Sequence, residues 1–202
     1  MAVIGNVVAN FVSRGWAAVM GIIFVPTYIQ YLGIEAYGLI GFFALIQAWM
    51  YLLDMGLTPA VGREMARFTS GAHSDKSIHD TFLTVGTVCA CIAFFGGFLV
   101  YLGKEFIGNN WLNISQLNMD SVQVVLTIMP LILGSRFLES FLQAVLMGLQ
   151  KQIDLGVVNA VGATIRYAGA VVVLAFISNS IEAFFYWQAF VSVITVLVLR
   201  AI

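Results

Sequence analysis

Long apolar runs alternate with short polar clusters along this chain. A bilayer core about 30 Å thick needs about 20 helical residues, which makes run length the first signal to read. The period-two alternation expected of membrane β-strands does not occur in these runs. Six runs are long enough, at about Ile4–Tyr31, Ala36–Leu57, Thr81–Gly103, Val122–Met147, Leu155–Ile177 and Ile181 to residue 202. The pattern predicts an all-α integral membrane protein with a bundle of six transmembrane helices.

The connections between these runs differ in length and charge. YLGIE (31–35) and SNSIE (178–182) are tight turns, whereas the connections after Val61 and Gly103 are longer. Successive connections lie on opposite sides of the membrane, so they form two sets. With the C-terminal end included, one set holds five basic residues and the other holds only Lys104. The major set holds Arg63, Arg67, Lys76, Lys151 and Arg200. Because basic residues stay on the cytoplasmic side, both termini are predicted to be cytoplasmic.

Composition supports a membrane location and argues against several functions. The chain is 61% apolar and 9% charged with mean hydropathy +0.97, whereas soluble domains carry about 25% charged residues. A net charge of −1 provides no basic arm for nucleic acid. Cys89 and Cys91 lie in an apolar run, and His73 and His79 lack further ligands at metal-binding spacing, so no metal is expected. Hydrolase, nucleotide-binding and dinucleotide motifs are not found, so we expect neither an enzyme nor a bound cofactor.

Three arginines lie deep inside predicted spans. Counted at 1.5 Å per residue from the nearer boundary, Arg14, Arg136 and Arg166 lie about 15 to 20 Å in, close to the bilayer midplane. Insertion scales assign each such arginine a cost of about 3 kcal/mol. The fold must offset this cost, which makes the three residues candidates for function.

Helical periodicity places each deep arginine on a polar face. At 100° per residue, the polar residues of one span fall within one arc of the helix. The three faces comprise Asn6, Asn10, Ser13 and Arg14; Arg136, Glu139 and Gln143; and Asn159, Gly162 and Arg166. Three helices that turn these faces inward would form a common polar cavity while their apolar faces meet lipid.

Two interpretations of these charges stay open. Arg136 and Glu139, three residues apart, can form an ion pair, and such pairs can simply hold helices in register. Glu139 is the one midplane carboxylate, because Asp54 lies near the cytoplasmic end of its span. Three arginines therefore exceed their local counter-charge, which favours a cavity for an anionic substrate. Glu139 and Asp54 are the candidate charge or coupling partners, with H⁺ or Na⁺ as the coupling ion.

Two prolines interrupt the predicted spans. Pro26 lies in the first span and Pro130 in the fourth. A proline inside a helix removes one backbone hydrogen bond, so both positions permit a kink.

Two stretches resemble a known family. FVPTYIQYLGIEAYGLIGFFALIQAWMYLLDMGLTPAVGREMAR (24–67) resembles the opening helix pair of the bacterial polysaccharide exporters of the Wzx type, with the family's YLG-x-x-x-YG turn and LLDxGL element. VLMGLQKQIDLGVVNAVGATIRY (145–167) is similar to the family's GLQ loop and fifth helix. The resemblance implies membership of the multidrug/oligosaccharidyl-lipid/polysaccharide exporter superfamily, whose members pack two six-helix lobes around a cavity and work by alternating access.

The resemblance also implies a substrate and partners. Such proteins flip an oligosaccharide linked to undecaprenyl pyrophosphate across the bacterial cytoplasmic (inner) membrane for polysaccharide synthesis, including lipopolysaccharide O-antigen. This chain of 202 residues corresponds to the N-terminal lobe of a protein with twelve or more helices. A second six-helix lobe and the polysaccharide polymerase machinery are the expected partners.

A pyrophosphate substrate assigns roles to the polar residues of the spans. Arg14, Arg136 and Arg166 would contact the phosphates electrostatically, and Glu139 would orient Arg136. Hydrogen bonds to phosphate or sugar would come from Asn10, Gln143 and Asn159. Two rivals remain: a multidrug or cation-coupled exporter of the same superfamily, and a non-transporting, half-length membrane assembly partner.

Overall fold

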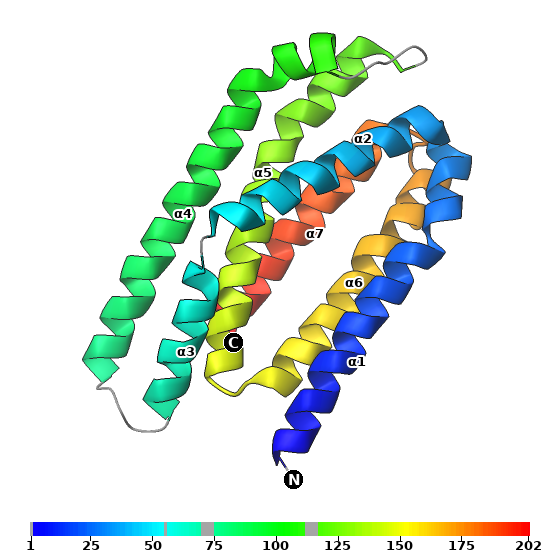
Figure 1. Ribbon diagram of the computed structural model, residues 1–202. Coiled ribbons are helices and arrows are strands. Elements are labelled where there is room, and N and C mark those ends of the chain that lie inside the picture. The colour runs from blue at the N-terminus through cyan, green and yellow to red at the C-terminus, as the bar shows by residue number, and fades with distance from the viewer. Residues whose placement is uncertain (1, 55, 70–74, 112–116) are drawn as a thin grey trace.

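The chain folds as a helical bundle, shown in Figure 1. The computed structural model describes residues 2–54, 56–69, 75–111 and 117–202. Within these ranges all regular structure is helical, and no strand occurs. The elements are α1 (Ala2–Ile23), α2 (Val25–Leu53), α3 (Leu57–Thr69), α4 (Asp75–Phe106), the π-helix η1 (Ile107–Trp111), α5 (Met119–Gly148), α6 (Gln152–Phe176) and α7 (Ile181–Ala201).

Several helices have the length and hydropathy of membrane spans. In the described part of the chain, five stretches qualify: Val25–Leu53, Lys76–Trp111, Met119–Gly148, Gln152–Phe176 and Ile181–Ala201. The outer faces carry large apolar side chains, with Phe11, Phe94 and Phe176 each about three-quarters exposed or more. A bundle in water would leave few such patches. The architecture is that expected of an α-helical, multi-pass membrane protein.

The first predicted span is broken beside Pro26, one of the two positions at which the sequence permits a kink. The run 4–31 is divided between α1, which ends at Ile23, and α2, which begins at Val25. Pro26 cannot donate a backbone hydrogen bond, and its ring crowds the preceding turn, so the helix breaks just before it. The predicted turn at 31–35 occurs within α2 at Gly33, whose φ of 81° is readily adopted by glycine. There the chain reverses direction, at the upper right of Figure 1.

The connection after the second predicted span contains an additional helix, α3. Its residues Val61 and Met65 are four apart and both buried, and the helix packs against α5 and α4. Gly62 and Gly148 permit close packing, because a Cβ at Gly148 would collide with the Gly62 carbonyl oxygen and the Met65 side chain. The sequence indicated only a long connection here, so this helix was not predicted.

Helix α5 is the centre of the bundle. It packs against α3, α4 and α7, and its first half contributes the buried residues Val122, Val125, Leu126, Met129, Ile132 and Leu133. The helix continues through Pro130 without interruption. On the other side of the bundle α1 packs along α6, where the Trp16 indole donates to the Thr164 hydroxyl at 2.9 Å.

The basic residues gather at one end of the bundle. Helix α3, the α5–α6 connection and the end of α7 all lie at the lower end in Figure 1, as does the start of α1. The Lys151 ammonium donates to the Ile202 carbonyl at 2.6 Å, which fixes the end of α7 beside the α5–α6 connection. The end of α4, with Lys104, lies at the opposite end. The structure thus keeps the uneven charge distribution from which cytoplasmic termini are predicted.

Candidate functional site

A polar cavity of about 240 Å³ lies inside the bundle between α1, α5, α6 and α7, with the end of α2 beside it. Helices α1, α5 and α6 contribute residues of the polar faces that their sequence periodicity predicts. The lining residues are Ser13, Arg14, Ala17, Tyr51, Arg136, Glu139, Gln143, Val158, Asn159, Gly162, Ala163, Arg166, Tyr167 and Thr195.

This cavity brings together most of the residues that the sequence singled out. Arg14, Arg136 and Arg166 all line it, so three arginines from three different helices share one site. Gln143 and Asn159 line it as well, and the Gln143 amide donates to Asn159 Oδ1 at 3.1 Å. The common polar cavity inferred from the helical faces is present.

Glu139 pairs with a different arginine from the one predicted. Its Oε2 accepts a hydrogen bond from Arg166 NH2 at 3.1 Å, and both side chains are 9% exposed. Its Oε1 accepts from the Gln143 amide at 3.2 Å. Glu139 therefore orients Arg166, not Arg136, because α6 presents its guanidinium directly to the carboxylate. The spacing of three residues between Arg136 and Glu139 therefore did not decide which arginine pairs with the carboxylate.

Arg136 has a neutral partner. Its NH2 donates to Oε1 of Gln188 on α7 at 3.4 Å, a long contact. Gln188 is buried, and its own amide donates to the Arg166 carbonyl at 3.5 Å. Arg136 is half-buried, and a guanidinium held by one neutral amide keeps most of its hydrogen-bonding capacity.

Two arginines of the cavity lining each have a buried nitrogen without a protein partner. Three buried side-chain atoms of the described residues lack a protein hydrogen-bond partner: Arg136 Nε, Arg166 Nε and Ser192 Oγ. Two of the three are arginine nitrogens of cavity-lining residues, and buried polar groups are normally satisfied. The charged residues of the lining are three arginines and Glu139, so its formal charge is 3 − 1 = +2. The site is suited to an anion that accepts several hydrogen bonds.

Two predicted residues lie outside the cavity. The Asn10 side chain is not part of the lining, although its backbone carbonyl accepts from the Ser13 hydroxyl at 3.1 Å. Asp54 lies at the end of α2, where its Oδ1 accepts from the Thr58 hydroxyl at 2.6 Å and from the Thr58 amide at 3.1 Å. Asp54 therefore joins α2 to α3 and is not a charge partner of the arginines. The prediction that Asn10 binds substrate has no geometric support.

Several polar residues of the site were not predicted from the sequence. Tyr51 and Thr195 line the cavity, and Gln188 accepts a hydrogen bond from Arg136. A signal existed for Gln188, because a single amide in the apolar run IEAFFYWQAF must find a partner inside a bundle. Tyr51 and Thr195 gave none, since both are common in membrane helices.

The described residues contain no group of three or more His, Cys, Asp or Glu side chains that could hold a metal ion. Of the two histidines considered above, His73 lies outside the described residues. Cys89 is buried in the core and Cys91 is exposed, so the two thiols of α4 face different surroundings.

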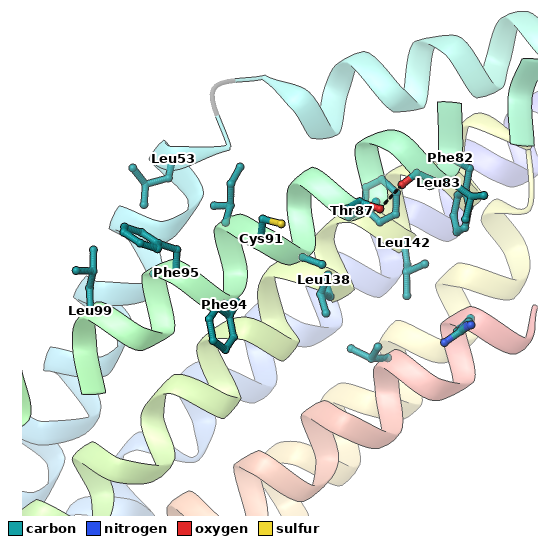
Figure 2. Close-up of a pocket in the computed structure, with 17 residues that line it drawn as sticks. Leu53, Phe82, Leu83, Thr87, Cys91, Phe94, Phe95, Leu99, Leu138 and Leu142 are labelled. Carbon is teal, nitrogen blue, oxygen red and sulfur yellow. Dashed lines mark hydrogen bonds between the residues drawn. The ribbon is translucent and has the colours of Figure 1, made fainter. Parts of the chain in front are cut away.

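A second, larger hollow has the opposite character. It measures about 1280 Å³ and runs along the outer side of α4, α5 and α7, as Figure 2 shows. Phe82, Leu83, Phe94, Phe95 and Leu99 of α4 form one wall, and the Thr87 hydroxyl donates to the Leu83 carbonyl at 2.7 Å within that helix. Arg200 is the one charged residue of its lining. This apolar groove offers no convergent polar groups, so we assign the functional site to the smaller polar cavity.

Comparison with known proteins identifies no relative: no family model, no curated protein and no solved structure matches this chain.

Proposed function

We propose that this chain is the N-terminal lobe of a lipid-linked oligosaccharide flippase of a bacterial cytoplasmic membrane. In this proposal the polar cavity binds the pyrophosphate of an undecaprenyl-pyrophosphate-linked oligosaccharide. Alternating access would then carry the substrate to the periplasmic leaflet for surface polysaccharide synthesis. The family and the glycan lipid rest on the sequence resemblance, and the anionic headgroup rests on the cavity.

The excess positive charge of the cavity carries the proposal. Three arginines face one carboxylate there, so positive charge is in excess. Arg166 is committed to Glu139, so Arg136 and Arg14 are the cations available to a ligand. A pyrophosphate offers several charged oxygens, and a guanidinium fork donates two parallel hydrogen bonds to such a group.

The size of the cavity limits which part of the substrate it can hold. Pockets that enclose a drug-sized ligand measure roughly 300 to 1,000 Å³, whereas this cavity measures about 240 Å³. It can therefore take the charged linkage of the substrate, but the sugars and the polyprenyl chain would lie outside it.

The rival functions make different demands on the same cavity. A multidrug or cation-coupled exporter needs carboxylates for its cationic substrates, and an excess charge of 3 − 1 = +2 repels them. A non-transporting assembly partner needs no ligand, because the bonds among Glu139, Arg166, Gln143 and Asn159 would serve to hold α5 and α6 together. Ligand binding separates this second rival from the flippase.

The first experiment measures the binding of inorganic pyrophosphate to the purified chain in phosphatidylcholine nanodiscs. We expect wild type to bind and Arg136→Ala to bind at least about tenfold more weakly, because a charge-assisted hydrogen bond contributes about 1.5 to 3 kcal/mol. Arg136→Lys keeps the charge without the planar fork and should lie between them. Lys104→Ala is the matched control, because it removes a cation from the last turn of α4, a helix that does not line the cavity.

Two results would contradict the proposal. One is wild-type protein that binds pyrophosphate no better than Arg136→Ala does, with both equally folded by thermal unfolding. The other comes from cells that depend on this protein for a surface glycan, if the Arg136→Ala variant exports it equally well at equal protein level.

A further inference from the structure

A second cavity, mostly apolar but with two arginines in its lining, adjoins the first at the basic end of the bundle. It measures about 440 Å³ and lies between α1, α3 and α5. Arg14 and Arg63 are the charged residues of its lining, which also includes Thr58, Ser140 and Gln143. We call this cavity the vestibule.

The vestibule and the inner cavity share part of their walls. Arg14 of α1 and Gln143 of α5 line both. Arg14 is exposed, whereas Arg166 is buried, so the arginines become less accessible from the vestibule inward. The two cavities therefore meet at Arg14 and Gln143, with Arg63 on the vestibule side and Arg136 on the inner side.

The packing of α1 and α3 leaves the vestibule between them. Helix α1 packs mainly on α6, whereas α3 packs on α5 and α4. The two helices stand apart at the lower end of Figure 1. Close contact of Gly62 with Ala144, where a Cβ would lie 3.3 Å from the Ala144 carbonyl oxygen, holds α3 against α5 and so fixes the position of Arg63.

Arg63 differs from its neighbour Arg67 on the same helix. Arg67 NH1 forms an ion pair with Glu64 at 3.3 Å and does not line the vestibule. Arg63 is exposed, lines the vestibule, and forms no ion pair with another described residue. The two arginines thus provide a matched pair, one lining the vestibule and one outside it.

We propose that the vestibule is the first anion site of the protein, at which Arg63 and Arg14 receive the phosphate or pyrophosphate group of the substrate before it reaches Arg136. This inference rests on the proposed function and adds to it an access route from the basic end, between α1 and α3. A charge at the mouth of a site chiefly accelerates association, whereas a charge deep within it chiefly holds the bound ligand. Arg63 is accordingly a steering residue and Arg136 a holding residue.

The test compares the kinetics of pyrophosphate binding in Arg63→Gln, Arg67→Gln and wild-type protein in phosphatidylcholine nanodiscs at low salt. We expect Arg63→Gln to slow association about fivefold, to change dissociation little and to weaken the dependence of the rate on salt. Arg67→Gln should stay within about twofold of wild type in association rate. A merely structural effect of Arg63 would not move the association rate and its salt dependence together.

The outcomes separate this inference from the proposed function. Wild type that binds no pyrophosphate would overturn both. Binding that depends on Arg136, together with equal association rates for the two glutamine variants, overturns the vestibule proposal alone.

The last experiment uses nanodiscs that contain phosphatidylglycerol. If that lipid lowers the wild-type association rate to that of Arg63→Gln, the vestibule holds phospholipid headgroups and is not a substrate route. An unchanged wild-type rate supports the substrate route.

Discussion

The two sides of α5 line hollows that differ in polarity and in volume. Arg136, Glu139 and Gln143 face the polar cavity, whereas Leu138, Phe141 and other apolar residues face the groove of Figure 2. The groove is about five times larger, at 1280 Å³ against 240 Å³. Lipid chains are as apolar as leucine, so an apolar groove is inexpensive in a bilayer, whereas buried charge is retained only against a cost. For a membrane protein, charge is thus a better guide to function than volume.

The largest expected effect comes from breaking the ion pair on the polar side. Arg166→Ala leaves Glu139 buried without its cation, and loss of one member of a buried pair costs about 3 to 5 kcal/mol. The free energy of unfolding in lipid–detergent micelles measures this cost. Replacement of both residues by methionine should recover most of it, because the uncompensated charge is then gone. A loss below about 1 kcal/mol in the single variant would show that water already solvates the pair.

A smaller effect is expected from a neutral member of the same network. Gln143→Leu removes the bonds to Glu139 Oε1 and Asn159 Oδ1, and each such bond contributes about 1 kcal/mol. We expect a loss of about 1 to 2 kcal/mol in the free energy of unfolding, with the bonds counted as only partly additive. Unchanged stability would mean that the amide of Gln143 is not needed to hold the carboxylate.

The smallest effect is expected on the groove side. Phe94 lines the groove and is 74% exposed. In Phe94→Ala, lipid would fill the space of the removed ring, so little protein packing is lost. Stability should change by no more than about 0.5 kcal/mol, and pyrophosphate affinity should be unchanged. A large loss of either would show that the groove is a functional surface and would reverse the comparison of the two sides.

Much of the site could be predicted because helical periodicity fixes the direction of each side chain relative to its own helix. This reasoning placed Arg14, Arg136, Arg166, Gln143 and Asn159 on inward faces, and the structure joins them in one cavity. It failed for Asn10, which lies beyond the lining of the cavity although it shares the face of Arg14. Position along a helix, as well as direction, decides whether a side chain reaches a site.

Other features could not be predicted because they depend on contacts between helices. The α3 helix has only Val61 and Met65 as buried residues, too short a pattern to distinguish from a loop. Gln188 meets Arg136 across the boundary between α5 and α7, a contact that no spacing in the sequence encodes. The groove was equally hidden, since apolar residues that face lipid and those that face protein have the same chemistry.

The sequence alone determined that this protein is built from apolar helices with three arginines near their centres and basic residues at alternate connections. Length, hydropathy and helical period are properties of each segment by itself, so they can be read from the order of residues. Only the tertiary structure decided that Glu139 belongs to Arg166 and that Arg136 is left with a neutral partner. An ion pair depends on how two helices are rotated and spaced against each other, and a sequence fixes neither until the bundle has packed.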